Sequence, residues 1–475
     1  MSEELAPDLC VIGAGPGGLA AAAGAAMLGA SVVLIEKASM GGDNLSYGSV
    51  PSKALLAAAR RAQAMRATKA FGITPTAPTI NHRAVHDHVQ TVVAAAAPNA
   101  SAERLTGLGV RVVNAAARFA DKATVLAGDL RIKARRFVIA TGSSPDVPAL
   151  PGLDKVPFFT TETILQNGSR LEHLVVIGAG AAGLELAQAH LRLGSKVTVV
   201  DTAKALALDD PELTAPLIER LRSEGMLLAE GVQIDRIEPR EGGVRIEVSS
   251  GSDRETLDAS HVLIATGRKP RVEGLGLEAA GIKFDRHGIK VSRRLLTSNP
   301  RVFAIGDVLG GPNHANIAIH QANLVIQAAL FRVSRPFNSA AATHVTFTDP
   351  ELAQAGLNED AARKRYGRRL RILRWPMAEN DRALAEHQDR GYVKVVTTPS
   401  GKILGATILG ENAGELIHVW ALAISEGLGI KAMTNYIPPY PTLGEINRHA
   451  GLAFATGHVT NPLVRQAVKF LSRFG

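Results

Sequence analysis

Two stretches of the chain follow the same order of apolar and polar positions. Residues 9–36 and 174–201 each begin with an apolar run, pass through a glycine-rich turn into small apolar residues, and end in a second apolar run closed by a carboxylate. Short apolar runs bounded by turn residues are typical of buried strands. Each stretch therefore predicts a strand, a tight turn, a helix and a second strand.

A second apolar pattern is also duplicated. Residues 137–142 and 262–267 are apolar runs that close on Ala-Thr-Gly, and a further run at 302–305 is followed by Gly306 and Asp307. These runs predict additional buried strands. The repeat therefore indicates an α/β protein built around one unit that is used twice.

The pattern changes near Thr343. Short apolar runs now alternate with helical patterns, and the turn Pro399-Ser400-Gly401 predicts a hairpin. Strands are predicted at 371–375, 391–398 and 403–409, and helices near 358–366, 411–427 and 442–456. We expect this part to form a separate α+β domain.

The glycine-rich turns have the spacing of dinucleotide-binding units. Each copy reads Gly-x-Gly-x-x-Gly, and its carboxylate stands 23 positions after the first glycine. The glycines allow a tight turn, close approach of a pyrophosphate, and packing of helix on strand, while the carboxylate accepts hydrogen bonds from ribose hydroxyls. The residues are Gly13, Gly15, Gly18 and Glu36 in the first copy, and Gly178, Gly180, Gly183 and Asp201 in the second. Two copies in this context predict two Rossmann-like dinucleotide-binding domains.

Composition narrows the classes of function. The 475 residues include one cysteine, Cys10, which excludes an intramolecular disulfide, a cysteine-based zinc site and a Cys-x-x-Cys redox pair. An aromatic share of 4% argues against base stacking, and we expect no nucleic-acid partner. The net charge of +9 is spread along the chain, so it permits an anionic partner or membrane surface without demonstrating one.

Residues 9–35 carry no charge and are long enough to span a bilayer. Their patterned glycines fit the strand–turn–helix unit better than a membrane helix. The short acidic segment 1–8 does not resemble a signal peptide, and we expect a cytoplasmic protein.

Taken together, these motifs resemble the class I pyridine nucleotide-disulfide oxidoreductases, the family of dihydrolipoamide dehydrogenase, glutathione reductase and mercuric reductase. The likeness covers almost the whole chain, and residues 186–197 and Tyr440 look closest to the mercuric-reductase branch. The motifs that carry it are Gly13–Gly18, Glu36, Gly41-Gly42, Pro51-Ser52-Lys53, Thr141-Gly142, Gly178–Gly183 with Glu185, Thr266-Gly267-Arg268, Gly306-Asp307, and Pro441-Thr442 with Glu445.

The resemblance implies FAD on the first repeat, a nicotinamide nucleotide on the second, and a homodimer whose active site borrows residues from both subunits. It divides the chain into the first part of an FAD-binding domain (1–150), an NAD-binding domain (151–270), the second part of the FAD-binding domain (271–340), a dimerisation domain (341–460) and a C-terminal amphipathic tail (461–475).

The resemblance also implies roles for individual residues. Glu36 is expected to bind the FAD adenosine, Asp307 the ribityl chain, and Lys53 to lie by flavin N5, paired with Glu185 near the nicotinamide. The other cofactor-binding positions it implies are Gly13, Gly15, Gly18, Gly41, Gly42, Thr141, Gly142, Gly306, Ala315, Gly178, Gly180, Gly183, Asp201 and Gly267.

The chain departs from the family at its redox motif. Asn44 and Ser49 stand where the family has its two cysteines, and neither side chain can cycle between thiol and disulfide. Cys10 lies inside the first predicted strand and has no partner. Tyr440 stands where thiol reductases carry a histidine base, and a phenol serves better as a hydrogen-bond donor at neutral pH. Glu445 remains, without an imidazole to orient.

We therefore expect a dimeric FAD enzyme that takes hydride from NADH and passes electrons directly to a small-molecule acceptor such as a quinone. Oxygen, dyes or a partner protein remain open as acceptors. Two alternatives are a nicotinamide nucleotide transhydrogenase and a non-catalytic flavoprotein with a structural or NADH-sensing role. Asp201 favours NADH over NADPH because it repels a 2′-phosphate, although Lys204 could soften that preference.

Three smaller features carry open interpretations. His82, His86 and His88 suggest a metal site, but a solvated helix face is the better interpretation, and we predict no metal. His449 is either a displaced base or an interface histidine. Ala181 replaces an aromatic residue that often follows the second glycine, which is either drift or easier access of nicotinamide to flavin.

The last residues of the chain predict an amphipathic helix. Asn461 and Pro462 form a plausible helix start. An apolar stripe (Leu463, Val464, Ala467, Val468, Leu471) is flanked by Phe470 and Phe474 and lies beside a basic row (Arg465, Lys469, Arg473). A helix this short is marginal alone in water, so it must dock on something. Docking on its own dimer is the simpler interpretation, and peripheral contact with an anionic membrane is the sharper one.

Overall fold

The computed structural model describes residues 3–311, 314–339, 342–455 and 462–474. Its first parallel sheet has five strands in the order β21-β8-β2-β3-β4. The strands are β2 (Leu9–Ile12), β3 (Val32–Glu36), β4 (Val110–Asn114), β8 (Arg136–Ile139) and β21 (Val302–Ala304). Helix α1 (Pro16–Met27) follows β2, and α8 (Ala315–Phe331) packs beside it. The central strand β2 is fully buried, because both faces of a parallel sheet are covered.

The second parallel sheet repeats this arrangement. Its order is β10-β17-β11-β12-β13, so β11, β12, β13 and β17 occupy the places of β2, β3, β4 and β8. The strands are β10 (Phe159–Thr160), β11 (His173–Ile177), β12 (Lys196–Asp201), β13 (Leu227–Glu230) and β17 (His261–Ile264), and helix α6 (Ala181–Arg192) follows β11. The predicted duplication is therefore present in the backbone, and the expected α/β architecture is confirmed.

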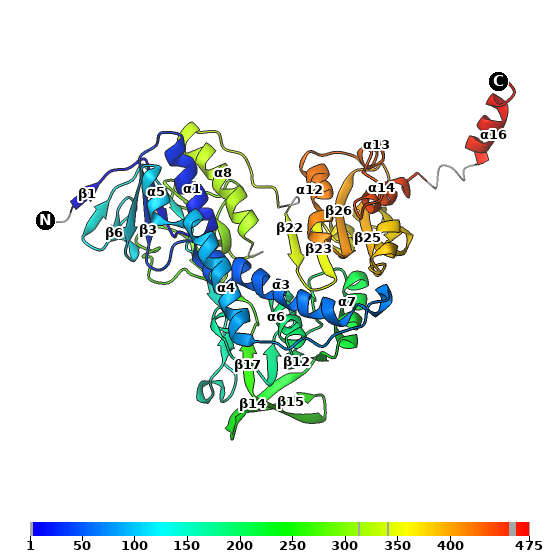
Figure 1. The fold of residues 1–475 in the computed structure, drawn as a ribbon. Coiled ribbons are helices and arrows are strands. Elements are labelled where there is room, and N and C mark those ends of the chain that lie inside the picture. Colours follow the sequence, from blue (N-terminus) through cyan, green and yellow to red (C-terminus); the bar gives the residue numbers. More distant parts are fainter. Residues whose placement is uncertain (1–2, 312–313, 340–341, 456–461, 475) are drawn as a thin grey trace.

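Smaller elements surround the two parallel sheets. A four-stranded sheet contains β1 (Glu3–Leu5), β5 (Ala117–Phe119), β6 (Val125–Ala127) and β7 (Leu130–Ile132), and an antiparallel meander contains β14 (Gln233–Arg240), β15 (Gly243–Ser250) and β16 (Asp253–Ala259). The meander extends below β12 and β17 (Figure 1). Further elements of this part of the chain include β19 (Phe284–Asp285), β20 (Gly288–Ile289), α2 (Gly42–Ser46), α3 (Ser49–Arg66), α4 (His82–Ala96), α5 (Ala102–Gly107) and α7 (Pro211–Ser223).

The two copies of Ala-Thr-Gly lie where the chain crosses between the parallel sheets. Strand β9 (Ser143–Pro145) follows the first copy, β18 (Arg268–Pro270) follows the second, and the two strands pair antiparallel. Thr141 Oγ1 donates to the carbonyl of Arg271, and Thr266 Oγ1 donates to the carbonyl of Asp146. The two chain segments that connect the parallel sheets therefore form a short two-stranded antiparallel sheet.

The third sheet is antiparallel, in the order β22-β23-β26-β25-β24. Its strands are β22 (Thr343–Thr346), β23 (Glu351–Gly356), β24 (Arg371–Pro376), β25 (Tyr392–Thr397) and β26 (Ile403–Gly410). Its helices include α9 (Glu359–Tyr366), α10 (Asp381–Ala385), α11 (Ala413–Leu416), α12 (His418–Ser425), α13 (Ala432–Asn435) and α14 (Glu445–Leu452). The predicted strands match closely, whereas the helix predicted at 411–427 is divided into α11 and α12. The expected α+β domain is confirmed.

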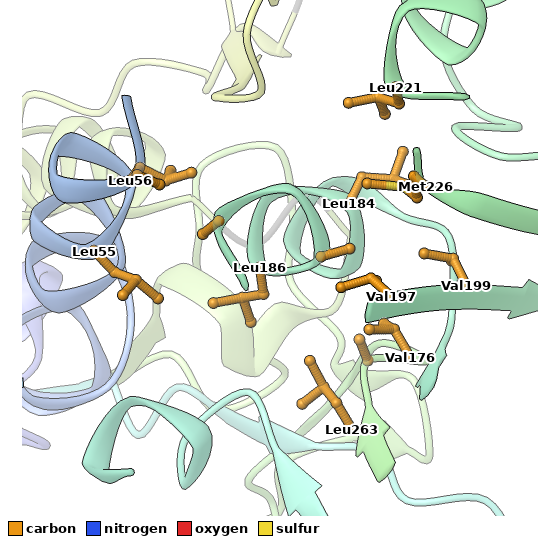
Figure 2. Packing of buried hydrophobic residues seen from close by; sticks show 14 of the residues in the cluster. Leu55, Leu56, Val176, Leu184, Leu186, Val197, Val199, Leu221, Met226 and Leu263 are labelled. Atoms are coloured by element: carbon orange, nitrogen blue, oxygen red, sulfur yellow. The ribbon is translucent and has the colours of Figure 1, made fainter. Parts of the chain in front are cut away.

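Helices α3 and α6 share one hydrophobic cluster. Leu55 and Leu56 of α3 are buried together with Leu184 and Leu186 of α6, and Figure 2 shows these side chains around α6. Burying a leucine side chain stabilises the fold by about 1.5–3 kcal/mol. The cluster therefore holds α3 firmly against the second parallel sheet, which matters because both helices carry predicted site residues.

The last described helix, α16 (Pro462–Leu471), lies away from the rest of the chain (Figure 1). Among the helices of the described ranges, none has the length and apolar character needed to cross a bilayer.

Candidate functional site

A cavity of about 530 Å³ lies at the first parallel sheet, beside the carboxyl ends of its strands. This edge is where open α/β sheets bind ligands. The predicted positions that line the cavity are Gly13, Gly15, Glu36, Gly42, Thr141, Gly142, Gly306, Asp307 and Ala315. Asn44 and Ser49 line it as well, whereas Gly18, Gly41 and Lys53 are not among its lining residues.

The first and third glycines of the two fingerprints meet equivalent constraints. Gly13 and Gly178 have φ angles of 103° and 112°, a region that side chains disfavour. A Cβ on Gly18 would lie 1.8 Å from the carbonyl oxygen of Gly13, and one on Gly183 would lie 2.0 Å from that of Gly178. The third glycine is therefore required because the helix packs directly on the turn.

The two predicted ribose carboxylates are also held alike. Glu36 accepts hydrogen bonds from the N–H groups of Ala14 and Ala38, at 2.6 and 2.8 Å. Asp201 accepts from Ala179 and Ala203 at 2.7 and 2.8 Å. Each carboxylate oxygen keeps a lone pair for a further donor. The backbone thus fixes both carboxylates in one orientation and leaves them able to accept hydrogen bonds from hydroxyl groups.

Asp307 lies at the end of a hydrogen-bond chain. Ser143 Oγ donates to Asp307 at 2.7 Å, and Arg268 Nε donates to Ser143 Oγ at 2.8 Å. Arg268 also contacts Glu162 at 3.0 Å and Asp43 at 3.4 Å. Burial raises the pKa of Asp43, with Arg268 opposing the shift. Sequence patterns did not identify Ser143 or Glu162, because neither residue belongs to a spaced motif.

The segment expected to replace a redox cysteine pair faces the cavity. Its lining includes Asp43 and Asn44 from α2, Tyr47, and Ser49 at the start of α3. Cys10 is fully buried in β2, and burial raises the pKa of its thiol. Its position in a central strand therefore keeps the thiol un-ionised and away from this loop.

Lys53 and Glu185 meet as predicted, from α3 and α6. Lys53 Nζ lies 2.6 Å from Glu185 Oε2, and the Glu185 side chain is only 8% exposed. Glu185 Oε1 accepts a hydrogen bond from the N–H of Phe347 at 2.9 Å, and Lys53 Nζ lies 4.2 Å from the centre of the Phe347 ring. The ammonium is held by a carboxylate and an aromatic face together.

Side chains on the same face of α6 bind the segment that follows β22. Gln188 exchanges hydrogen bonds with the backbone of Asp349, at 2.8 and 2.9 Å. Arg192, which is 3% exposed, pairs with Asp349 and with buried Glu224, both at 2.7 Å. Since these residues and Glu185 recur at helical spacing, α6 positions Phe347 as well as its own carboxylate.

Tyr440 and Glu445 lie outside the cavity of their own chain. Tyr440 Oη donates to Asp381 Oδ2 at 2.7 Å, and this bond to Asp381 raises the pKa of the phenol. Glu445 Oε2 accepts from the N–H of Thr442 at 3.4 Å. Asp381 was missed in the sequence, because it lies 59 positions from Tyr440 and belongs to no motif. His449 stacks on Trp375 with ring centres 5.0 Å apart, as an interface or packing residue does.

Two of the three histidines of α4 face the protein interior rather than forming only a solvated helix face. His82 and His86 line a small cavity together with His190, whose buried ring has a pKa lowered to about 4, mainly by burial. His88 is exposed on the other side of α4. In the part of the chain that the structure describes, no three metal-ligating side chains are arranged around a common point.

These residues fit an extended dinucleotide. A Cβ on Gly15 or Gly180 would meet no protein atom within 4 Å, so both turns leave their backbone open to a close ligand. The first cavity combines this turn with two fixed carboxylates, Glu36 and Asp307, which suits a ligand with phosphates and several hydroxyl groups. The first turn and these two carboxylates therefore fit FAD, and the second turn with Asp201 fits a nicotinamide nucleotide.

Comparison with protein families matches residues 7–322 to "Pyridine nucleotide-disulphide oxidoreductase" and residues 342–450 to the dimerisation domain of the same family. The chain is 34% identical to mercuric reductase of Streptomyces lividans over 465 residues, covering 94% of this chain and 96% of that protein. It is 35% identical to dihydrolipoyl dehydrogenase of Pseudomonas aeruginosa over 469 residues, covering 96% and 99%.

Solved structures give the same result. The HOCl-induced flavoprotein disulfide reductase RclA of Escherichia coli matches with a TM-score of 0.83, and LpdA of Mycobacterium tuberculosis with 0.85. Both are 25% identical and cover 94% of this chain and 99% of their own. The matched dimerisation domain supports a homodimer. With both dinucleotide turns, their carboxylates and the third domain all accounted for, the chain belongs to the pyridine nucleotide-disulphide oxidoreductase family, whose members use FAD and NAD(P)H.

Proposed function

We propose that this protein oxidises NADH and passes the electrons through FAD directly to an acceptor that is not a disulfide, with a quinone as the favoured class. The observation that carries the proposal is the pair Asn44 and Ser49 on the cavity wall, in a sequence whose one cysteine is buried in β2. A chain with this composition has no dithiol to relay electrons. The acceptor must therefore react at the cofactor itself.

The overall reaction converts NADH, one proton and a quinone into NAD⁺ and a quinol. Bound FAD supplies the two-electron chemistry, and the protein supplies position and electrostatics. Glu185 holds the ammonium of Lys53 in one place, and Phe347 limits its movement further. A fixed positive charge of this kind stabilises negative charge that develops during hydride transfer, without reorganisation at that moment.

The acceptor side is lined by small polar groups. Asn44 and Ser49 offer an amide and a hydroxyl where the family places sulfur, and both can hydrogen-bond to the carbonyl oxygens of a quinone. Tyr440 of the partner subunit borders this pocket in our proposal. Because Asp381 raises the pKa of Tyr440, the phenol stays protonated well beyond neutral pH. Its one O–H, which Asp381 accepts within the chain, would have to turn to the quinone oxygen when the acceptor binds.

We further propose that the enzyme prefers NADH and works in the cytoplasm. Asp201 repels a 2′-phosphate, and Lys204, the cation that could offset it, lies 3.7 Å from Glu230. Glu230 also binds Arg222 at 3.0 Å, so both cations already have a carboxylate partner. This arrangement supports a higher kcat/KM for NADH than for NADPH.

An anaerobic dithionite titration of the FAD-loaded dimer tests the proposal. We expect reduction to be complete after two electrons per FAD, without the long-wavelength absorbance that a thiolate beside flavin produces. Dihydrolipoamide, oxidised glutathione and mercuric ion should not be turned over. Uptake of four electrons, or steady turnover of any of these three substrates, contradicts the proposal.

A further inference from the structure

Helix α16 presents large apolar side chains to solvent. Val468, Phe470, Leu471 and Phe474 are 61%, 57%, 63% and 74% exposed. The helical turn continues past Leu471, because Ser472 and Phe474 donate backbone hydrogen bonds to Val468 and Leu471. Phe470 and Phe474 stack edge to face with ring centres 5.2 Å apart. Such a surface needs an occupant, since soluble proteins rarely leave a contiguous apolar patch uncovered.

The apolar and basic residues of α16 lie on separate faces. At 3.6 residues per turn, the apolar side chains of residues 464–474 fall within an arc of about 160°. Arg465, Lys469 and Arg473 fall together on the opposite side. This separation is what a helix lying in the plane of a membrane surface requires.

The charge of the helix points to an anionic occupant. Residues 462–474 contain three cations and no carboxylate. The ordinary surface helix α9 differs, because its Arg363 pairs with Glu359 one turn away. Three cations at four-residue intervals repel one another on an isolated helix. A negatively charged surface removes that repulsion, whereas an uncharged protein groove does not.

The length of α16 restricts how it can meet a bilayer. Its ten residues span about 15 Å, half of the hydrocarbon thickness, so it can rest on the membrane but cannot cross it. We propose that α16 binds the surface of a bilayer containing anionic lipid, with Val468, Phe470, Leu471 and Phe474 inserted among the acyl chains. Arg465, Lys469 and Arg473 then face the lipid phosphates.

Vesicle co-sedimentation of the full-length, FAD-loaded dimer tests this proposal without any measurement of activity. One set of vesicles contains phosphatidylcholine alone, and the other has about a third of its lipid replaced by phosphatidylglycerol. We expect sedimentation with the anionic vesicles at low ionic strength, weaker binding at high ionic strength, and no binding to the neutral vesicles.

Three variants separate the tail from the rest of the basic surface. Deleting residues 462–475 should abolish binding. Arg465→Gln/Lys469→Gln/Arg473→Gln should weaken the partition coefficient on the order of 100-fold, at roughly fivefold for each cation. Lys364→Gln/Arg368→Gln/Arg369→Gln removes the same charge from exposed positions on and after α9 and should bind normally.

The apolar face has its own test. Leu471→Gln/Phe474→Gln keeps every charge, and we expect it to weaken binding at least tenfold, because inserted apolar surface contributes as much as charge. Two results overturn the proposal. One is full-length protein that stays in the supernatant with anionic vesicles at low ionic strength. If deletion of 462–475 also makes the dimer less stable, that result identifies the partner subunit as the occupant. The other is binding that the deletion leaves unchanged.

Discussion

The Nζ atom of Lys53 lies 2.6 Å from Oε2 of Glu185 and joins α3, one turn after Ser49, to α6. Arg60, on the same helix α3, forms a second ion pair with Glu351, with 2.7 Å between its guanidinium nitrogen and the Glu351 Oε1 atom. The side chains of this pair have the same exposures as Lys53 and Glu185, 35% and 8%. The two pairs are alike in burial and chemistry, but only the first is expected to lie near the nicotinamide. The Arg60–Glu351 pair therefore provides a matched control for the role of Glu185.

We predict that Glu185→Gln slows reduction of bound FAD by NADH about 100-fold, because the ammonium of Lys53 loses the carboxylate that positions it. Glu351→Gln should change the same rate by less than about threefold, although both variants lose one buried carboxylate. Anaerobic stopped-flow absorbance measures both rates, with FAD content checked in each preparation. Equal slowing in the two variants would show that Glu185 acts only through stability.

Restoring the cysteine pair should restore a second redox centre. The variant Asn44→Cys/Ser49→Cys places two thiols on the wall of the cavity, at the positions where the family resemblance implies a disulfide. We predict that this variant takes up four electrons per FAD in an anaerobic titration, whereas Asn44→Ser/Ser49→Ala still takes up two. A variant that stays at two electrons with both thiols oxidised to a disulfide would mean that the loop holds them out of reach of FAD.

Tyr440 and Asp381 should affect only the acceptor side. Because Asp381 raises the pKa of Tyr440, the phenol remains protonated, and the quinone-dependent rate should not fall as the pH rises from 7 to about 9.5. Tyr440→Phe should slow the reaction with quinone about tenfold while reduction by NADH stays unchanged. Asp381→Asn keeps a hydrogen-bond partner and should bring the alkaline fall in rate to a lower pH. A rate of reduction by NADH that falls in both variants would contradict this assignment.

The contact between α7 and the antiparallel sheet should make stability depend on pH. The pKa of Glu212 is lowered from an ordinary value of 4.5 to about 2. The largest cause is the hydrogen bond from Arg374, and a hydrogen bond from Lys394 adds to it. A lowered pKa contributes stability that is complete above about pH 4.5 and is lost as the pH falls towards 2. Arg374→Gln removes the largest cause, so its Tm should lie below that of the wild type at pH 7, and the difference should shrink as the pH falls from about 4.5 towards 2.

Thermal unfolding between pH 2.5 and 7 measures this convergence. Arg382→Gln breaks the exposed pair with Glu386 and serves as the control, since its Tm should stay close to that of the wild type throughout. A difference between Arg374→Gln and the wild type that keeps the same size at every pH would mean that Glu212 does not supply the effect.

The repeat made much of the nucleotide-binding geometry predictable. The spacing from Gly13 to Glu36 determines one local backbone path. Because that path occurs twice, Glu36 and Asp201 accept hydrogen bonds from N–H groups at equivalent positions of the two copies. Lys53 and Glu185 were predicted from the family resemblance, since 132 positions separate them and no local pattern joins them.

The remaining site residues depend on tertiary contacts that leave no pattern in the chain. Glu162 reaches Arg268 from a turn 106 positions away, and Asp381 reaches Tyr440 across the third domain. The helix predicted at 411–427 begins only at Ala413, because Asn412 takes the left-handed conformation with φ 53°. An apolar pattern identifies the buried face of such a segment but does not locate its breaks.

A two-step stopped-flow experiment tests the central claim most directly. NADH is mixed anaerobically with the FAD-loaded dimer until the flavin absorbance is bleached, and an excess of a water-soluble quinone is then added. We predict that the absorbance returns at least as fast as steady-state NADH–quinone turnover, and that the cycle repeats until one substrate is exhausted. Flavin that NADH reduces only slowly, or that quinone fails to reoxidise, would contradict the account and identify a protein that binds its nucleotides without turnover.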